Sequence, residues 1–336
     1  MKSALGYVEL AESAHGRIGR PVSFSYIWGE ALAELDQRKP DVRMVNLETS
    51  ITTSEQWAPK GINYRMHPKN AACLTAARLD CCAVANNHVL DFGPAGLIET
   101  LEALARAGIK PAGAGRDRRE AEAPAVLELP EGSRVLVFAF GTVTSGIPPG
   151  WAATETRPGV NLLPDLSDRT VSAVAAGIRS RKQPGDIVVA SVHWGGNWGY
   201  DIPPGHREFA RALIDRAGVD VIHGHSSHHP KGIEIYRDRP ILYGCGDFLN
   251  DYEGIEGKKE FRGELTLMYF VTFDPGQDRL VRLELTPVRI RRFRLQRAMR
   301  EEAAWLAEML NREGRALNTG VSLNPDSTLS VRWRSG

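Results

Sequence analysis

The 336-residue sequence has few cysteines and no long apolar segment. Its four cysteines, Cys73, Cys81, Cys82 and Cys245, form no Cys-x-x-Cys pair. We therefore expect reduced, mostly buried thiols rather than a disulfide scaffold. No apolar run approaches the length of a membrane span, and residues 1–20 lack the basic segment and apolar core of a signal peptide. These absences favour a cytoplasmic protein.

An excess of charge of either sign is also missing. Lys and Arg number 42 against 41 Asp and Glu, which gives a formal net charge of +1. This balance provides no basic stripe for nucleic acid and no electrostatic attraction to an anionic membrane. Hydrophobic residues are 42% and charged residues 25%, as in ordinary soluble globular proteins, and the length suits one large α/β domain or two average domains.

Short apolar strands alternate with amphipathic helices along most of the sequence. We expect strands at 42–48, 81–85, 135–140, 186–192, 219–222 and 240–243. We expect helices at 26–35, 68–77, 93–107, 169–181, 206–217 and 296–311. Alternating runs at 265–273 and 280–290 predict an antiparallel pair, and 329–333 predicts a last strand. This order is typical of a layered α/β fold with a largely parallel sheet and an antiparallel extension.

Side chains that bind metals or move protons follow four of these strands. They are Asn46 with Glu48, Asn87 with His88, His193, and His225 with His228. Loops converge to form ligand sites at the strand ends of open α/β sheets. Imidazole nitrogens, a carboxylate and an amide oxygen suit divalent transition metals. The sequence therefore predicts one shared metal site at these ends.

Each residue has a simpler interpretation when it is taken alone. Glu48 would cap a helix or turn, Asn87 and His88 would form a turn, and His193 would be a core histidine. The segment 223–229 would be a solvated loop, although four of its seven residues are histidines in a chain that has nine. Independent caps and core histidines are not expected to collect at successive strand ends, so we favour the shared site.

Four segments resemble the motif series of the CapA family, which is linked to poly-γ-glutamate capsule synthesis and shares the metallophosphoesterase fold. They are Asn46–Leu47–Glu48, Ala85–Asn86–Asn87–His88, His193–Trp194–Gly195 and Gly224–His225–Ser226–Ser227–His228. Gly246–Asp247–Phe248 resembles the late block of that family, and the resemblance runs from residue 42 to 251. It implies a calcineurin-like α/β/β/α sandwich over residues 1–295, with a C-terminal helix and strand at 296–336 packed on it.

The resemblance also implies roles for these residues. Two divalent metals, Mn, Fe or Zn, would activate a water, and His88 would be the acid–base residue. The implied metal ligands are Glu48, Asn87, His193, His225 and His228. Residues expected to support the ligands or contact substrate are Asn46, His223, Arg65 and Asp247. Lys231 and Arg116 are further candidates for binding an anionic substrate.

One segment of the family pattern is absent. Family members usually open with a strand that ends in a Gly-Asp-x-Met-x-Gly-Arg-like segment, whose Asp is a metal ligand, and nothing before Glu48 matches it. In the related fold that strand lies inside the sheet, so its absence would leave neighbouring strands unpaired. We therefore expect the sequence to begin downstream of the true start, which would leave room for an upstream signal or anchor.

Two functions stay open. The first is a metal-dependent hydrolase acting on a phosphoester or a glutamyl-type amide, and the second is a non-catalytic accessory or binding protein in capsule polymer synthesis or export. The Asn87–His88 pair and the histidine cluster favour the hydrolase, whereas the absent carboxylate favours the accessory role. The expected partners are a small-molecule or polymer substrate, such as poly-γ-glutamate, and the capsule-synthesis machinery, with no nucleic acid.

Overall fold

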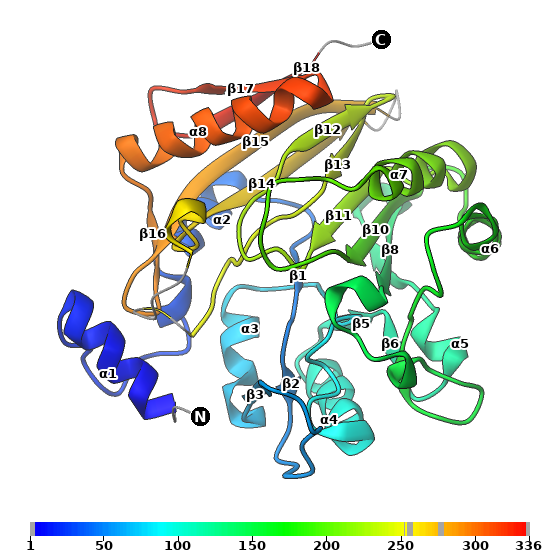
Figure 1. Cartoon of the computed structure of the whole chain (residues 1–336), viewed down its shortest axis with the longest axis horizontal. Coiled ribbons are helices and arrows are strands. Elements are labelled where there is room, and N and C mark those ends of the chain that lie inside the picture. The colour runs from blue at the N-terminus through cyan, green and yellow to red at the C-terminus, as the bar shows by residue number, and fades with distance from the viewer. Residues whose placement is uncertain (1–3, 252, 254–257, 275–278, 334–336) are drawn as a thin grey trace.

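Three larger sheets form the frame of this computed structural model, which describes residues 4–251, 253, 258–274 and 279–333 (Figure 1). The largest sheet has the strand order β12-β13-β11-β10-β8-β7. Its four inner strands run parallel, and the two edge strands run antiparallel to their neighbours. The strands are β7 (Ala125–Glu128), β8 (Arg134–Gly141), β10 (Ile187–His193), β11 (Val221–His225), β12 (Ile233–Tyr236) and β13 (Arg239–Leu242).

The two other sheets differ in strand direction. One is parallel, in the order β1 (Met44–Asn46), β4 (Cys81–Ala83) and β5 (Lys110–Ala112). The other is antiparallel and consists of β14 (Leu265–Asp274), β15 (Arg279–Ile290), β16 (Leu295–Arg297), β17 (Thr319–Leu323) and β18 (Leu329–Trp333). Two short pairings add β2 (Ser50–Ile51) with β3 (Arg65–Met66), and β6 (Ala114–Gly115) with β9 (Gly159–Val160).

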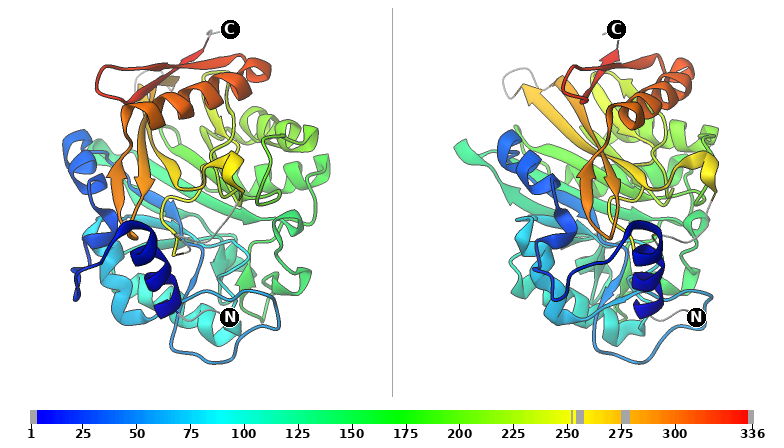
Figure 2. Two further views of the ribbon diagram at one scale, coloured as in Figure 1. Left: turned by 60° about the vertical axis from the view of Figure 1, so that its left-hand side comes forward. Right: turned by 90° about the vertical axis from the view of Figure 1, so that its left-hand side faces the viewer.

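Helices cover these sheets through separate apolar clusters (Figures 1 and 2). Helix α4 (Gly93–Arg106) packs with the parallel three-stranded sheet, α6 (Asp168–Arg179) and α7 (Pro204–Ala217) with the largest sheet, and α8 (Arg300–Gly314) with the antiparallel sheet. The remaining α-helices are α1 (Ala4–His15), α2 (Ala31–Arg38), α3 (Ala72–Ala76) and α5 (Arg118–Ala121). Short 3-10 turns occur at Tyr26–Trp28, Pro68–Ala71, Pro130–Gly132, Val143–Ser145, Pro149–Trp151, Lys259–Phe261 and Arg315–Leu317.

The apolar strands of the sequence are buried on both faces. On β8, Leu136 and Phe138 lie in the cluster with α6 and α7, whereas Val135 and Val137 lie in a second cluster on the opposite face. Successive strand side chains point to opposite faces, so a continuous apolar run serves two clusters at once. The second cluster also contains Cys81 of β4, so side chains of the largest sheet and of the parallel three-stranded sheet share one core.

Two helix predictions need correction. The predicted helix at 26–35 is interrupted at Gly29, where φ is 46° and an added Cβ would lie 2.0 Å from the Leu295 carbonyl oxygen, and α2 begins only at Ala31. The predicted helix at 296–311 is wrong at its start, because residues 295–297 form β16 against β15. Helix α8 begins at Arg300, where the Glu302 side chain accepts a hydrogen bond from the Met299 N–H. The predicted antiparallel pair at 265–273 and 280–290 is confirmed.

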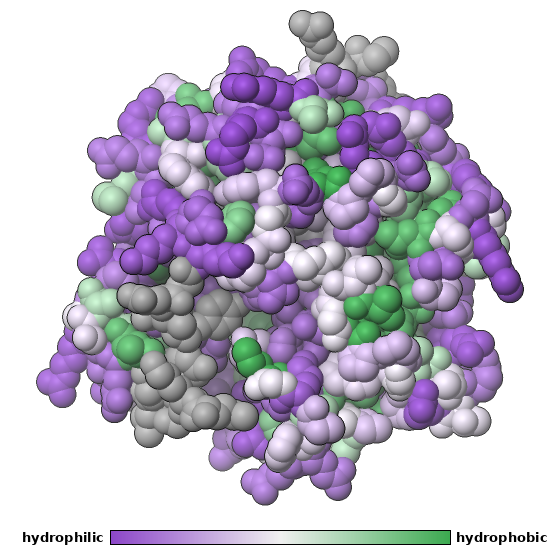
Figure 3. All heavy atoms as spheres, viewed as in Figure 1, coloured by the Kyte–Doolittle hydropathy of each residue, from purple (hydrophilic) through white to green (hydrophobic). Residues whose placement is uncertain are grey.

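Other expectations from the sequence can be compared with the fold. All four cysteines are free thiols, and Cys81 and Cys82 are buried, as expected. Among the described residues, no helix is both long enough and apolar enough to span a bilayer. The face shown in Figure 3 is largely hydrophilic, with smaller apolar patches between the polar residues. Of the C-terminal segment 296–336, residues 334–336 lie outside the described part of the chain.

Two strand edges face a deep groove. Among the described strands, β1 pairs only with β4, and β14 pairs only with β15. Residues of both edges line a groove of about 1790 Å³, whose wall includes alternate side chains of β10 and β11, among them Ile187, Val189 and Val221. The groove extends to Glu48 and His228.

Substitution of Gly224 tests how closely β11 must approach β13. A Cβ at Gly224 would lie 2.5 Å from the Leu242 carbonyl oxygen and 2.6 Å from that of Tyr243, so β11 has to shift. We expect Gly224→Ala to lower the free energy of unfolding by about 1–3 kcal/mol, as overpacking does. Gly196→Ala is the matched control, because no atom lies within 4 Å of its added Cβ. Equal denaturation midpoints for the two variants would contradict the prediction.

Candidate functional site

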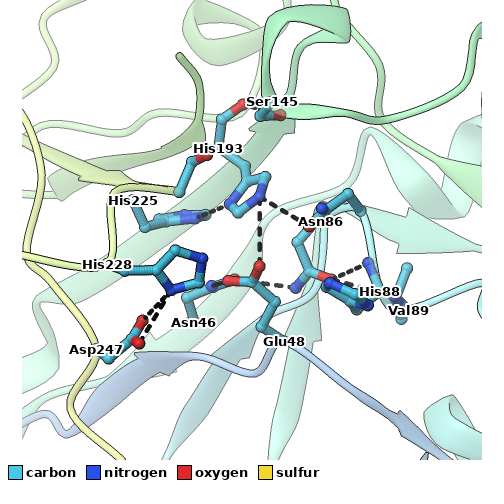
Figure 4. Close-up of polar contacts among 12 residues, drawn as sticks. Asn46, Glu48, Asn86, His88, Val89, Ser145, His193, His225, His228 and Asp247 are labelled. Carbon is cyan, nitrogen blue, oxygen red and sulfur yellow. Dashed lines mark hydrogen bonds and ion pairs between the residues drawn. The ribbon is translucent and has the colours of Figure 1, made fainter. Parts of the chain in front are cut away.

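Residues from four strand ends converge in one polar group (Figure 4). Asn46 is the last residue of β1, His193 the last of β10 and His225 the last of β11. His193 and His225 are paired in the parallel register of β10 and β11, so their side chains leave the sheet side by side. Asn87 and His88 follow β4 in the turn before α4. The fold therefore brings these predicted site residues to one edge of the sheets.

His193 lies at the centre of the group. Its Nδ1 atom is 2.6 Å from Nδ1 of His225, and its Nε2 atom is 3.1 Å from Oδ1 of Asn87 and 3.7 Å from Oε1 of Glu48 (Figure 4). The residue is fully buried. Burial, followed by the neighbouring positive charges, lowers the pKa of His193 to about 3, and burial also lowers the pKa of His225. Both imidazoles are therefore neutral at pH 7.

Asn86 joins two of the strand ends, and the sequence analysis did not single it out. Its Nδ2 donates to Oδ1 of Asn46 and to the carbonyl of Leu47, and its Oδ1 accepts from the N–H groups of His88 and Val89. Because Asn86 is fully buried, these hydrogen bonds are shielded from water. The one available signal was the Asn-Asn pair after an apolar strand, since asparagine often organises such turns.

The carboxylates Glu48 and Asp247 lie on the groove side of the group. Nδ1 of His228 is 2.9 Å from both carboxylate oxygens of Asp247, and Nδ2 of Asn46 donates to Glu48 over 2.9 Å. Burial, and then the charge of Asp247, raise the pKa of Glu48 to about 7. Burial disfavours the charged form of His228, but the hydrogen bond and charge of Asp247 outweigh it and raise the pKa of His228.

Two other predicted residues, His223 and Arg65, have contacts of their own. His223 is 2.9 Å from the Ser191 hydroxyl, which also lies 2.9 Å from Nε2 of His225. Arg65 donates to the Ser54 carbonyl and lies over the Phe92 ring.

Two further cations, proposed for an anionic substrate, have protein partners. Lys231 donates to the Asp201 carbonyl, and Arg116 forms an ion pair with Glu120. Arg116 also lies 3.9 Å from Glu102 in an ion pair. Of the three cations predicted to bind an anionic substrate, Arg65 lines the groove.

The side chains of the group are of types that bind a divalent metal, but their present arrangement does not form a metal site. Three imidazoles, two carboxylates and an amide oxygen are suitable ligands for Mn, Fe or Zn. Yet no three His, Cys, Asp or Glu side chains in the described part of the chain are grouped to hold a metal ion. Two nitrogens bound tetrahedrally to one Zn²⁺ at ~2.0–2.1 Å would lie ~3.4 Å apart. His193 and His225 are closer, at 2.6 Å, because one ring donates a hydrogen bond to the other.

Comparison with known proteins places this chain among proteins of capsule synthesis. Residues 3–252 match the model of a family described as "Bacterial capsule synthesis protein PGA_cap". A probable polyglutamine synthesis accessory protein of Mycobacterium tuberculosis is 49% identical over 333 residues, which cover 98% of this chain and 87% of the relative. The PGA biosynthesis protein CapA of Bacillus subtilis is 28% identical over 75% of this chain and 62% of its own length. The capsule biosynthesis protein CapA of Bacillus anthracis is 28% identical over 58% and 46%.

The raised pKa of Glu48 predicts a pH-dependent stability. Its pKa in the folded protein, about 7, exceeds the ordinary value of 4.5, so ionisation of Glu48 destabilises the fold as the pH rises between these values. We expect Glu48→Gln, which cannot ionise, to gain in melting temperature relative to the unmodified protein over this range in a chelating buffer. Glu155→Gln is the control, since the Glu155 side chain is 75% exposed. A difference that does not change with pH would refute the prediction.

Proposed function

The chain belongs to the family of bacterial capsule synthesis proteins described as PGA_cap, and we propose on that premise that it acts in the synthesis of a poly-γ-glutamate-type polymer. The family membership confirms the resemblance to CapA expected from the motifs. The relative from Mycobacterium tuberculosis is similar over nearly the whole chain. It is described as a probable polyglutamine synthesis accessory protein, which supports this role. The proposed partners are the polymer or a small precursor and the capsule-synthesis machinery.

Within that role we propose a metal-dependent hydrolase that acts on a phosphoester or a glutamyl-type amide. The observation that supports it best is the position of His193, between His225 on one side and Asn87 and Glu48 on the other. A core histidine needs one or two hydrogen-bond partners, whereas four metal-ligating side chains from four strand ends are a costly arrangement for stability alone.

The proposed ligands are Glu48, Asn87, His193, His225 and His228. Bound divalent metal ions, two by analogy with the fold, would supply Lewis acidity and an activated water. His193 and His225 are already neutral, which leaves nitrogen lone pairs for ligation once their mutual hydrogen bond is broken. Asp247 would hold the His228 ring in orientation from behind. His88 would donate a proton to the leaving group.

A non-catalytic accessory role is the second candidate, and a specific observation favours it. His193 and His225 bond to each other, and His225 also contacts Ser191, so their polar atoms already have partners within the protein. Such a group can keep the strand ends together without any metal. The term "accessory" in the description of the Mycobacterium tuberculosis relative agrees with this alternative.

Metal content and turnover separate the two candidates. For the hydrolase we expect bound Mn, Fe or Zn by elemental analysis and hydrolysis of bis-p-nitrophenyl phosphate or a γ-glutamyl anilide. His193→Ala should lose the metal, whereas His88→Ala should keep it and lose about 10²–10⁴-fold in kcat. His15→Ala, at the end of α1 and outside the polar group, is the control. A protein that binds no metal and hydrolyses none of these substrates would support the accessory role.

We further propose that the sheets form the layered metallophosphoesterase-like sandwich with one more strand between β1 and β14. Both edges are open to the groove, and Ile187, Val189 and Val221 of β10 and β11 form part of its wall, which suits a strand with apolar residues facing it. An acidic residue at the end of that strand would meet His228, whose charged form the site favours.

Hydrogen exchange tests this strand position. We expect a variant extended at Met1 by a flexible linker and an alternating apolar strand ending in Asp to protect backbone amides of β1 and β14 from exchange, because the added strand would pair with both edges. The control extension contains the same residues in a non-alternating order. Equal exchange at β1 and β14 in both extended variants would rule out the proposed strand.

A further inference from the structure

Four aromatic rings outside the proposed ligand set gather beside His228. Trp198 and Tyr200 lie in the loop between β10 and α7, His229 follows His228, and Phe261 ends a 3-10 turn before β14. The centre of the His229 ring is 4.4 Å from that of Phe261 and 4.8 Å from that of Tyr200. The centre of the Trp198 ring is 5.5 Å from those of both His228 and Phe261. Three separate segments thus form one aromatic cluster, which consists of Trp198, Tyr200, His229 and Phe261.

The aromatic cluster reaches the surface at Trp198. This side chain is 36% exposed, whereas His229, whose ring stacks with it at 6.0 Å, is fully buried. An added Cβ at Gly196 or Gly199 would meet no atom within 4 Å, so open space lies beside the loop at two positions that flank Trp198. A ligand bound at His228 can therefore contact the Trp198 ring at the same time.

The loop that contains Trp198 is held in place by the segment after β11. The backbone N–H of His228 donates to the carbonyl of Asn197 over 3.0 Å, and the ammonium group of Lys231 donates to the carbonyl of Asp201 over 2.7 Å. These bonds fix the backbone on both sides of Trp198. The position of this ring relative to the site is therefore set before any ligand binds, which lowers the entropic cost of binding.

The buried imidazole of His229 has an unused hydrogen-bond acceptor. Its Nδ1 lies 3.0 Å from the carbonyl oxygen of Pro230, which only accepts, so Nδ1 has the proton. Its Nε2 is buried without a hydrogen-bond partner in the described part of the chain. Neither nitrogen pairs with a carboxylate there, so the ring is neutral and Nε2 is an acceptor. An unpaired buried acceptor is costly, and a phenyl ring at this position would pack without that cost.

This chemistry selects a ligand that has an N–H donor and an apolar face. An amide N–H can donate to Nε2 of His229, whereas the oxygens of a phosphoester are themselves acceptors and cannot pair with it. Indole and phenyl rings pack on methylene groups and on flat amide groups. A γ-glutamyl chain offers both features, because each of its units joins methylene groups to an amide.

We propose that the aromatic cluster is a subsite that binds an amide unit of a γ-glutamyl polymer, with Nε2 of His229 accepting the amide N–H and the Trp198 ring packing on the chain. The inference rests on the proposed function in polymer synthesis. Of the two substrate classes named there, it favours the glutamyl-type amide over the phosphoester. Because His229 is fully buried, the Trp198 side chain has to rotate to admit the amide, as exposed side chains readily do.

Binding of a fluorescein-labelled γ-glutamyl oligopeptide, measured by fluorescence anisotropy, tests the subsite. We expect Trp198→Ala to weaken binding by ~30-fold, because a large aromatic contact is lost. His229→Phe should weaken binding by ~3–10-fold, because the amide loses its acceptor while a ring remains. His229→Phe should not lower the melting temperature, because it removes an unpaired polar atom from the interior. A merely structural role for His229 would leave the affinity unchanged.

Trp57→Ala and His206→Phe are the matched control variants. Trp57 is 62% exposed in the loop between β2 and β3, and His206 is a buried imidazole that stacks with Trp194 at 4.6 Å. Neither control should change the affinity for the γ-glutamyl peptide. Inorganic polyphosphate, a polyanion without N–H groups, is the control ligand, and its binding should be equal in the unmodified protein and in all four variants.

The outcomes separate this inference from the proposed function. The inference is overturned if the peptide does not bind, if Trp198→Ala binds it as tightly as the unmodified protein, or if polyphosphate binding falls in parallel. Hydrolysis of bis-p-nitrophenyl phosphate without peptide binding would leave the hydrolase proposal standing alone. Peptide binding that depends on Trp198 and His229, with no turnover of any substrate, would sink the hydrolase proposal and leave the subsite intact. If His229→Phe does not fold, the surface variant Trp198→Ala and the polyphosphate comparison still decide the inference.

Discussion

The register between β10 and β11 is the constraint on which the site depends. Parallel pairing places His193 opposite His225 at the last position of both strands, so the two rings meet at 2.6 Å without help from a loop. The close approach of β11 to β13 at Gly224 keeps that ladder continuous with the next strand. Asn87 and Glu48 follow β4 and β1 of the parallel three-stranded sheet, and the core shared by Cys81 of β4 and Val137 of β8 brings that sheet within reach. The packing of the sheets thus positions the strand ends, and the segments that follow them contribute Glu48, Asn87 and His228.

Burial and neighbouring charges shift the pKa values of the group in different directions. Burial lowers the pKa of His193 and of His225, while the contact with Asp247 raises the pKa of His228. Glu48 is pushed toward its neutral form by burial and by Asp247. A bound cation would lower the pKa of Glu48, because a nearby positive charge favours the carboxylate. The electrostatics of the group therefore respond strongly to any added positive charge.

The sequence predicted the framework well because its strands are buried on both faces. The apolar runs of β8 and β10 supply side chains to clusters on both faces of the sheet, and His193 after the second run marked the end of β10. Helix boundaries were harder, since Leu295–Arg297 has no strand signal of its own and becomes β16 only through pairing with β15.

The hydrogen bond between His193 and His225 links the two candidate functions. It satisfies two buried imidazoles, whose polar atoms would otherwise be costly in a dry environment. A metal that binds both rings has to replace that bond, so part of its binding energy offsets the lost interaction. An accessory protein would keep the bond permanently, whereas an enzyme would exchange it for ligation.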